Sequence, residues 1–357
     1  MIALITGSSG LIGSSCVDFF SKKGFKVIGI DNDMRSYFFG KQCSTVQTEQ
    51  KLKEQFENFQ SFNVDIRDFI KLENIFNEFN TDISIIVHTA AQPSHDWAAK
   101  EPITDFSINA LGTINLLELF RKYCPKATFI FTSTNKVYGD RPNLLNLTEL
   151  EKRFDFFEND TPSSIDESMS IDNCKHSIFG ASKVSADIMV QEYGKYFDLN
   201  TVAFRGGCLT GQNHKGSEMH GFLSYLVKCI IKNKPYNIFG YKGKQVRDNI
   251  YSFDLVEMFW NFHLNPKKGE VYNAGGGRQN SISIIEAIDK INNIANLKWN
   301  KYTILENNRI GDHKWYITNL NKFKKDYPEW KLKHSIDEIL AKMIEFEIQN
   351  KNINNND

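Results

Sequence analysis

The chain contains 357 residues, of which 41% are hydrophobic, so it is long enough to bury one large core or two fused lobes. Lysine plus arginine and aspartate plus glutamate number 43 each, and this balance argues against a bulk basic field for binding nucleic acid or an anionic membrane. The six cysteines are scattered with no C-x-x-C pair, which is typical of reduced thiols in a cytoplasmic protein and not of a disulfide framework or a structural zinc site.

The N-terminus is apolar from the start, but residues 2–5 run directly into a glycine turn. They have no charged lead and no small-residue cleavage site, so we interpret them as a strand and not as a signal peptide. No apolar run approaches the length needed to cross a bilayer. The sequence therefore predicts a protein without a membrane partner.

Residues 1–205 alternate short apolar runs with amphipathic segments, and we expect them to form one domain. This strand–helix alternation predicts an α/β fold with a parallel, doubly wound sheet of the Rossmann type. The predicted strands cover residues 3–5, 26–30, 85–87, 128–131 and 200–204, and the predicted helices cover 12–21, 69–79, 109–123 and 181–197.

Beyond residue 205 the alternation becomes less regular. Residues 206–221 are rich in glycine and polar side chains, as expected of a loop that lines a pocket. We predict that residues 206–348 form mainly a smaller C-terminal mixed α/β lobe that binds the substrate, with interleaved core segments. Residues 349–357 are rich in asparagine and are predicted to form a polar tail. Helices are predicted in the smaller lobe at 223–232, 281–294 and 336–346.

The first predicted strand ends in a glycine turn, Gly7-x-x-Gly10-x-x-Gly13, that opens the first helix. Glycines at this spacing allow a tight turn, a close approach of backbone to a pyrophosphate and close packing of helix on strand. Asp31 ends the second strand, where a carboxylate accepts hydrogen bonds from the adenosine ribose and repels a 2′-phosphate. The first domain is therefore predicted to prefer NAD(H) to NADP(H), although Arg35 nearby weakens that preference. The alternative is a glycine turn that binds no ligand.

The glycine spacing resembles that of the extended short-chain dehydrogenases/reductases, and further segments agree with that family in order over residues 1–330. Residues 63–68 resemble the segment whose Asp-Ile pair contacts adenine, residues 88–92 resemble the H-x-A-A loop beneath the cofactor, and residues 109–113 match the N-x-x-G-T helix. The resemblance implies that NAD is the cofactor. The cofactor-binding residues that it implies are Gly7, Ser9, Gly10, Leu11, Ile12, Gly13, Asp31, Asn32, Asp65, Ile66, Thr89, Ala90, Ala91, Gln92, Asn109, Thr132 and Lys183.

A further segment, residues 131–139, ends a predicted strand and resembles the family sequence S-S-x-x-V-Y-G. The resemblance implies that Thr134 hydrogen-bonds the reacting sugar oxygen, and that Lys183 binds the nicotinamide ribose and supplies positive potential. The alternatives are a strand-end hydroxyl bonded to backbone for Thr134 and a solvated helix lysine for Lys183.

The family signature Tyr-x-x-x-Lys is present with one change, because Phe179 stands in the tyrosine position ahead of Lys183. A phenol there can act as general acid and base once the cation lowers its pKa, and a phenyl ring cannot. Three explanations stay open: the change was introduced to trap a complex, another group takes the proton, or redox catalysis has been lost. His176 is the candidate replacement, and the alternative is an ordinary loop histidine; further candidates are Cys174, Tyr138, His95 and Lys183.

Within the family, residues 90–99 and 134–139 resemble the nucleotide-sugar 2-epimerases that act on CDP-paratose and their close relatives. In the family, arginines at the positions of Arg247 and Arg309 bind the substrate diphosphate, and planar guanidinium forks suit phosphate oxygens. A solvated surface arginine is the alternative for each. The substrate-binding residues implied in this way are Pro93, Ser94, His95, Thr134, Asn135, Lys136, Arg205, His220, Arg247 and Arg309.

The resemblance implies an NAD-dependent nucleotide-sugar epimerase, most closely one that inverts C2 of a CDP-hexose through a transient keto sugar. Two other possibilities stay open. One is a different 4-epimerase, dehydratase or oxidoreductase acting on nucleotide sugars, because a fold alone does not determine the chemistry. The other is a non-catalytic NAD-bound protein that binds a nucleotide sugar.

Two expectations concern partners. Helices 109–123 and 181–197 occupy positions that pair as a four-helix bundle in many relatives, so a homodimer or higher homo-oligomer is expected. His214 and His220 are polar candidates near the sugar, but they lack the paired spacing of a metal site, so no metal is expected.

Overall fold

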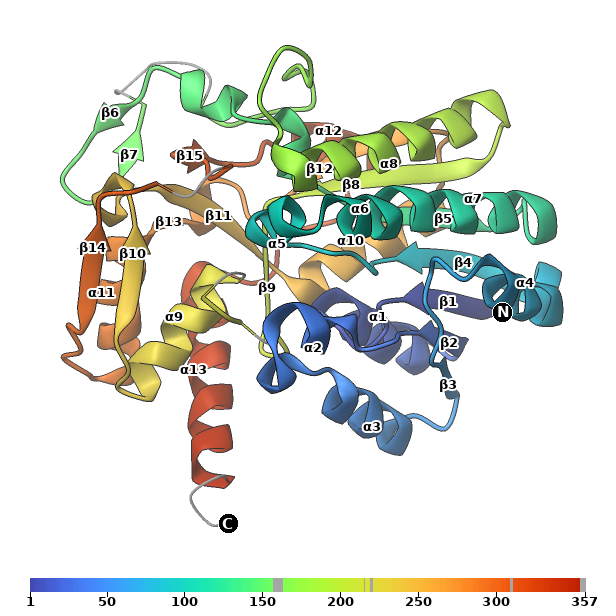
Figure 1. Ribbon diagram of the computed structural model, residues 1–357, viewed down its shortest axis with the longest axis horizontal. Coiled ribbons are helices and arrows are strands. Elements are labelled where there is room, and N and C mark those ends of the chain that lie inside the picture. Colours follow the sequence, from blue (N-terminus) through green and yellow to red (C-terminus); the bar gives the residue numbers. More distant parts are fainter. Residues whose placement is uncertain (157–162, 215, 219–220, 309–310, 354–357) are drawn as a thin grey trace.

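The computed structural model describes residues 1–156, 163–214, 216–218, 221–308 and 311–353, and a seven-stranded sheet dominates it (Figure 1). The strand order is β12-β8-β5-β4-β1-β2-β3, and every neighbouring pair is parallel. The order reverses at β1, and open α/β sheets bind ligands outside the carboxyl ends of their strands at such a point. The strands are β1 (Ile2–Thr6), β2 (Lys26–Ile30), β3 (Phe59–Phe62), β4 (Ile83–His88), β5 (Thr128–Thr134), β8 (Asn200–Gly206) and β12 (Glu270–Ala274).

Helices cover both faces of this sheet, because its central strands are apolar on both sides. One face packs against α1 (Leu11–Lys22), α10 (Ser252–Leu264) and α12 (Asn321–Asp326). The other face packs against α4 (Phe69–Phe79), α7 (Gly112–Tyr123) and α8 (Ser177–Tyr196). This three-layer arrangement confirms the predicted doubly wound α/β fold. It also draws α10, β12 and α12 from beyond residue 205 into the main body.

A smaller lobe lies beside the carboxyl ends of the main strands (Figure 1). Its mixed sheet has the order β13-β11-β15, with β9 also pairing with β11, and β10 pairs with β14 in a second sheet. Three helices of this lobe share one apolar core. The strands are β9 (Cys208–Thr210), β10 (Tyr236–Phe239), β11 (Val246–Tyr251), β13 (Ser281–Ser283), β14 (Tyr302–Leu305) and β15 (Trp315–Tyr316), and the helices are α9 (Phe222–Ile231), α11 (Ile284–Ala295) and α13 (Ile336–Ile353).

The connections carry short helical segments and one hairpin. The helical segments include α2 (Met34–Phe39), α3 (Val46–Gln55), α5 (His95–Lys100), α6 (Pro102–Phe106), a π-helical turn (Ser107–Leu111) and a 3₁₀ turn (Asn135–Tyr138), and the hairpin joins β6 (Thr148–Glu149) to β7 (Phe154–Asp155).

Several predicted element boundaries were wrong. Residues 281–283 form β13 and not the first helical turn, because Ser283 caps α11: its Oγ accepts from Glu286 N–H at 3.1 Å, and the Glu286 carboxylate accepts from Ser283 N–H at 2.8 Å. Residues 349–353 continue α13 instead of opening the tail, since each residue added to an existing helix gains a hydrogen bond. The predicted loop 206–221 contains β9, which gains a ladder with β11. The rest of the predicted tail, residues 354–357, lies outside the described residues.

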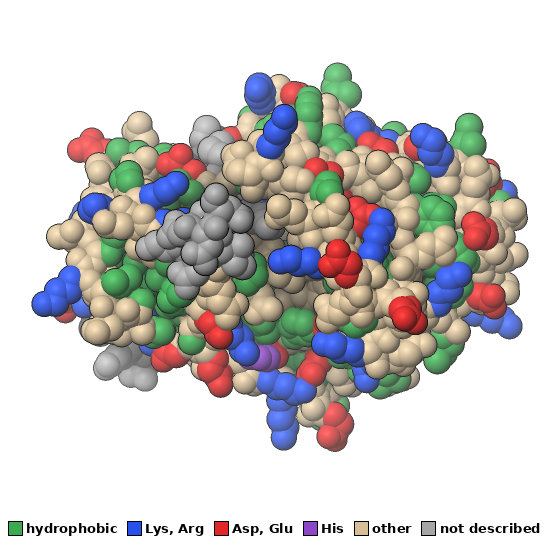
Figure 2. Space-filling model, turned by 90° about the horizontal axis from the view of Figure 1, so that it is seen from below, with side chains coloured by type: hydrophobic (Ala, Val, Ile, Leu, Met, Phe, Trp, Pro, Cys, Tyr) green, Lys and Arg blue, Asp and Glu red, His purple; other side chains and the backbone are tan. Residues whose placement is uncertain are grey.

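The molecular surface agrees with the balanced composition. Figure 2 shows acidic and basic side chains interspersed over the face that it draws. Within the described residues, no helix has the length and apolar character that crossing a membrane requires. All six cysteines lie in the described part of the chain and carry free thiols.

Candidate functional site

A cavity of about 450 Å³ lies between the carboxyl ends of the main strands and the smaller lobe. One wall, here called the cofactor wall, comes from the glycine turn and the segments that follow β2, β3 and β4. The opposite wall, called the sugar wall, comes from α5, the end of β5, β10, β11 and the start of α9. The predicted site residues that line this cavity are Gly7, Gly10, Leu11, Ile12, Asp31, Asn32, Asp65, Ile66, Thr89, Ala90, Ala91, Pro93, His95, Thr132, Thr134, Asn135, Lys136, Phe179, Lys183 and Arg247.

The glycine turn joins the end of β1 to the start of α1. Gly7 has a φ of +66°, and its N–H donates to Ile30 O at 2.7 Å, which attaches the turn to β2. A Cβ on Gly13 would lie 1.9 Å from Gly7 O, so only glycine lets α1 approach the strand end this closely. Gly10 lines the cavity at the N-terminus of this 12-residue helix, where backbone N–H groups attract phosphate. This cradle fits the pyrophosphate of NAD.

Asp31 lies at the end of β2 on the cofactor wall. Its carboxylate accepts from Ser9 N–H and from Asp33 N–H, both at 2.9 Å. Burial raises the pKa of Asp31. Arg35 lines the same part of the cavity, with its guanidinium carbon 4.9 Å from the centre of the Phe39 ring. Asp31 thus presents a buried carboxylate to the cavity, with a cation nearby, and its contact with a ribose stays a prediction.

Asn32 and Asp65 continue the cofactor wall. The Asn32 side chain donates to Asp65 at 3.0 Å, and Arg67 donates to the same carboxylate at 2.6 and 2.9 Å. Burial opposes ionisation of Asp65, but the hydrogen bonds from Arg67 outweigh it and hold the pKa of Asp65 below its ordinary value. The carboxylate therefore stays charged in a fixed position.

Lys183 lies on α8 where the two walls meet. Its Nζ donates to Thr132 O at 2.7 Å and lies 4.1 Å from the centre of the Phe131 ring. Burial lowers the pKa of Lys183 to about 7. The side chain is therefore buried at the cavity and is not a solvated helix lysine.

Thr134 and Phe179 line the cavity close to Lys183. The Thr134 Oγ1 accepts from Lys136 N–H at 3.2 Å, so the hydroxyl bonds to backbone and faces the cavity as well. Helix α8 begins four residues earlier than predicted, so it includes Phe179 and places the ring on the same helix face as Lys183. A phenyl ring thus fills the position at which the family signature has a phenol.

His95 lies against Phe179 on the sugar wall. The two ring centres are 5.1 Å apart, and the ring planes meet at 74°. The His95 Nδ1 lies 2.7 Å from Ser177 Oγ. An ionisable imidazole therefore stands directly beside the aromatic ring that cannot ionise.

Three predicted residues lie behind the cavity wall and shape its loop. The Gln92 and Asn109 side-chain amides donate to Asp105 at 2.6 and 3.0 Å. Ser94 caps α5 by accepting from Trp97 N–H at 3.3 Å. Their predicted contacts with ligand stay predictions.

Two further candidates do not line the cavity. The His176 Nε2 lies 2.8 Å from Ile171 O, which directs the ring into its own loop. Arg205 is buried, forms an ion pair with Asp187 at 2.9 Å and donates to Tyr138 Oη at 3.2 Å. Neither side chain lines the cavity, although His176 Nδ1 lies 3.4 Å from the backbone oxygen of Lys136, which does.

Two cations approach the cavity on the sugar wall. Arg247 Nη1 donates to Val246 O at 2.8 Å, and its Nη2 lies 3.8 Å from Asp312 Oδ1. Lys136 Nζ donates to Gly311 O at 2.8 Å. These groups suit a phosphate-bearing substrate. His220 and Arg309, which were also predicted here, lie outside the described residues.

The cavity includes side chains that the sequence analysis did not assign to the site. They come from the first turn of α9 and from β10, and they combine aromatic rings with an amide. Such groups stack on a planar base and hydrogen-bond its edge. In the sequence, the short, mainly apolar run 236–239 after a predicted helix could have indicated a strand at the cavity. These residues are Phe222, Tyr236, Asn237 and Phe239.

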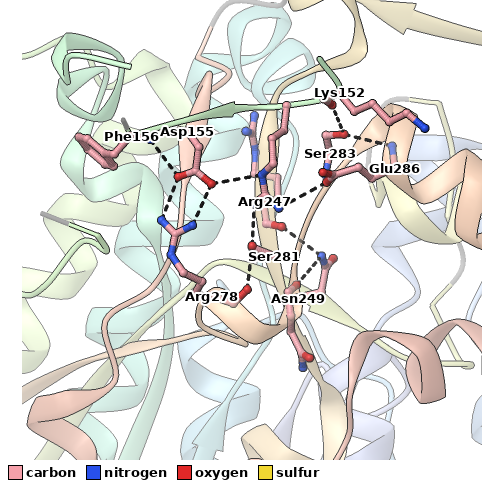
Figure 3. A network of polar contacts seen from close by, with 11 residues as sticks. Lys152, Asp155, Phe156, Arg247, Asn249, Arg278, Ser281, Ser283 and Glu286 are labelled. Carbon is pink, nitrogen blue, oxygen red and sulfur yellow. Dashed lines mark hydrogen bonds and ion pairs between the residues drawn. The ribbon is translucent and has the colours of Figure 1, made fainter. Parts of the chain in front are cut away.

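A polar network attaches the β6–β7 hairpin to the sheet that carries Arg247 (Figure 3). Asp155 accepts two hydrogen bonds from Arg278, at 2.8 and 2.9 Å. Ser283, on β13 beside β11, donates from Oγ to Lys152 O at 2.6 Å. Burial opposes ionisation of Asp155, but Arg278 outweighs it and holds the pKa of Asp155 below its ordinary value. The hairpin is thereby held against the sugar wall by charge and not by apolar packing alone.

No group of three or more His, Cys, Asp or Glu side chains in the described ranges is arranged to hold a metal ion. The expectation that the protein needs no metal stays a prediction.

Comparison with known proteins identifies the family. Its profile, that of the NAD dependent epimerase/dehydratase family, matches residues 3–275. CDP-paratose 2-epimerase of Salmonella typhi is 30% identical over 353 residues, which cover 97% of this chain and 99% of that protein. The structure of UDP-glucose 4-epimerase from Bifidobacterium longum in complex with NAD+ and UDP has a TM-score of 0.80 at 22% identity, covering 99% of both chains.

A second solved structure is similar over the whole fold. It is a tyrosine-to-phenylalanine mutant of UDP-glucuronic acid 4-epimerase from Bacillus cereus, in complex with UDP-4-deoxy-4-fluoro-glucuronic acid and NAD. Its TM-score is 0.79 at 24% identity, covering 98% of this chain and 100% of that one.

The glycine cradle and the charged acceptors on the cofactor wall agree with the matched family, whose members depend on NAD. This agreement confirms the predicted cofactor. The profile match and the 30% identity to a relative over nearly the full length of both proteins establish that this chain belongs to the NAD dependent epimerase/dehydratase family.

Proposed function

We propose that this protein is an NAD-dependent nucleotide-sugar epimerase that inverts C2 of a CDP-hexose through a transient keto sugar. The observation that carries the proposal is a continuous cavity that joins the glycine turn to Thr134, Lys183 and Arg247. Direct hydride transfer needs a site of this kind, because the reacting atoms must lie about 3–3.5 Å apart. The likeness to CDP-paratose 2-epimerase supports both the C2 position and the CDP-sugar.

The chain's own residues would bind and orient the two ligands. When bound, NAD+ supplies an acceptor for the hydride of the sugar carbon and can return it to the opposite face. Lys183 would hold the nicotinamide ribose and keep positive potential beside the reaction, since its Nζ is anchored at Thr132 O. The Thr134 hydroxyl would hydrogen-bond the oxygen on the reacting carbon. Arg247 would hold the substrate diphosphate with its planar fork.

Phe179 favours a second candidate function, which is binding of NAD and a nucleotide sugar without turnover. Oxidation of an alcohol releases a proton, and a phenyl ring cannot take it. The mutant Bacillus cereus epimerase, with phenylalanine in place of a tyrosine, holds NAD and a sugar nucleotide together. A 4-epimerase or dehydratase is the third possibility, because the family includes both reactions.

The test is incubation of the purified protein with NAD+ and a panel of nucleotide sugars in deuterated water, followed by NMR and mass spectrometry. CDP-paratose should be converted to its C2 epimer without uptake of solvent deuterium. Inversion at C4, or deuterium uptake with loss of water, would identify a 4-epimerase or a dehydratase instead. Binding without any conversion would leave the non-catalytic function.

We also propose that two copies pair through α7 and α8. Apolar side chains are exposed on these helices and on the turn that precedes α7, with Leu111 47% exposed and Ile188 40% exposed. Sedimentation of the purified protein as a monomer would contradict this pairing.

The free thiols suit the reducing cytoplasm, where we propose that the enzyme acts.

A further inference from the structure

We propose that His95, held by Ser177, takes the substrate proton that a phenol at position 179 would otherwise take. This inference rests on the proposed function of the same cavity. It assigns the missing acid/base role to a residue on α5, outside the Tyr-x-x-x-Lys signature.

The first argument is position. The His95 and Phe179 ring centres are 5.1 Å apart, and both side chains line the cavity together with Thr134 and Lys183. The imidazole therefore reaches the region in which the family signature places its phenol. His176, by contrast, is directed toward Ile171 O and does not line the described cavity.

The second argument is orientation. Ser177 Oγ lies 2.7 Å from His95 Nδ1 and accepts from Gly180 N–H at 3.3 Å. Ser177 has a φ of +63°, in the left-handed region that costs a non-glycine residue about 1–2 kcal/mol. This conformation keeps its hydroxyl at the start of α8, facing α5. Gly311 also packs closely on the ring, because a Cβ there would lie 2.7 Å from His95 Nδ1.

The third argument is the tautomer that this contact permits. When Nδ1–H donates to Ser177 Oγ, the lone pair of His95 is on Nε2, which becomes the nitrogen that can accept a proton. Histidine is the side chain whose charge changes most readily near neutral pH, as a group that both takes and returns a proton requires. Lys183 is oriented differently, because its Nζ donates to Thr132 O.

The proton balance is complete without another reagent. In the first half-reaction the O–H bond of the C2 hydroxyl breaks and its proton goes to His95 Nε2. The electron pair left on oxygen forms the C2=O bond as the C2 hydride leaves to NAD+. In the second half-reaction the hydride returns to the other face of C2, and the imidazolium gives its proton back to the oxygen.

The test compares the native protein with His95→Ala, His95→Gln, Phe179→Tyr and the double variant His95→Ala/Phe179→Tyr. Loss of a positioned acid/base should lower turnover in both His95 variants by about 10²–10⁴-fold. Added imidazole should restore part of the activity of His95→Ala, more strongly for more basic imidazoles. Phe179→Tyr should restore activity in the double variant, because it supplies the phenol. Calorimetric affinity for NAD+ should be the same in all five proteins.

Ser177→Ala tests the positioning role of the serine. It should lower kcat by about 10-fold or less and leave KM unchanged, since it removes one hydrogen bond that orients the base.

The proposal is overturned if folded His95→Ala retains native turnover, or if neither imidazole nor Phe179→Tyr restores activity that it has lost. His95→Gln is the control for a folding defect in His95→Ala, because the amide is polar and of similar size but cannot take a proton. A native protein that binds its substrate and does not turn it over would overturn the epimerase function as well. Native turnover together with an active His95→Ala would refute only the role of His95.

Discussion

The cofactor wall and the sugar wall of the cavity are built in different ways. On the cofactor wall the key groups follow directly after strands of one parallel sheet, as the glycine turn follows β1 and Asp31 follows β2. Backbone geometry therefore sets their positions. On the sugar wall His95 and Arg247 come from α5 and β11, far apart in sequence, and reach the cavity only through packing of the lobe on the sheet. Local geometry makes the first wall, and long-range contacts make the second.

The two walls also differ in what holds them. The glycine turn depends on the absence of side chains, since Gly13 approaches Gly7 O so closely. The sugar wall depends on side-chain bonds such as those between Asp155 and Arg278. Substitutions on the cofactor wall should therefore act through sterics and cofactor affinity, and those on the sugar wall through substrate affinity and turnover.

Lys183→Met should have the largest effect, because this lysine lies where the two walls meet. Turnover should fall by about 10²–10⁴-fold as the positive potential beside the reaction is lost. The cofactor-free protein should instead become more stable, by about 1–4 kcal/mol, because a buried charge is replaced by an apolar chain of similar length. Urea denaturation and steady-state kinetics on the same preparation would measure both changes. A Lys183→Met variant that loses stability as well as activity would contradict this prediction.

The stability change in Lys183→Met should depend on pH. The folded pKa of Lys183 is about 7 and the unfolded value is about 10.4, so between these values the unfolded chain binds the extra proton. Native stability should therefore rise with pH across this window, and the methionine variant should lack that rise. Unfolding curves at both ends of the window would check this, and parallel pH profiles of the two proteins would refute it.

Gly13→Ala should break the cofactor wall itself. Its Cβ would meet the backbone oxygen of Gly7 at 1.9 Å, so α1 or the turn must move, and we expect a loss of about 3 kcal/mol in the free energy of unfolding. Gly24→Ala is the control, because it has a positive φ of +82° but no atom within 4 Å of its Cβ. Thermal unfolding would compare the stability of the two variants. A smaller loss of unfolding free energy in Gly13→Ala than in Gly24→Ala would contradict the prediction.

Asp31→Ala should weaken NAD+ binding without affecting the sugar wall. Loss of a hydrogen bond to a charged acceptor is worth about 1.5–3 kcal/mol, so the Kd for NAD+ should rise by about 10–150-fold. Affinity for NADP+ should change less, since a 2′-phosphate is repelled by the native carboxylate. Calorimetry with both cofactors would measure this. Tighter binding of NADP+ than NAD+ by the native protein would contradict the proposed role.

Arg278→Ala should have the smallest effect and should act on the sugar wall alone. Arg278 is 47% exposed, so solvent screening limits its pair with Asp155 to about 1 kcal/mol. Affinity for the nucleotide sugar should fall, and NAD+ affinity should not. Arg121→Ala is the matched control, because Arg121 pairs with Glu118 on the outer surface of α7. An equal effect of both variants on sugar binding would contradict a role for the network.

At acid pH the native protein and Arg278→Ala should have the same free energy of unfolding. The folded pKa of Asp155 is held below its unfolded value, so the pair adds stability above that unfolded value of about 3.9. As the pH falls through the folded pKa, this stability is lost. Acid unfolding of the two proteins should therefore converge, and a constant difference at all pH values would refute the assignment.

Much of the main body could be predicted from the sequence because its signals are local. The predicted segments 26–30 and 69–79 coincide with β2 and α4, where apolar spacing alone marks the element. Strands β3 and β12 were not predicted, although both pair in the main sheet. Strand β12 joins β8 from beyond residue 205, so its pairing is decided by long-range contacts.

The candidate site divides in the same manner. The glycine turn, the acidic residue after β2 and the spacing of Phe179 and Lys183 could be predicted from the sequence, because each depends on neighbours along one chain segment. No such local signal places His95 beside Phe179 and in contact with Ser177, which is 82 residues away in sequence, or directs His176 elsewhere. Spacing along a strand or helix follows from backbone geometry, whereas a contact between α5 and α8 exists only once the whole sheet has packed.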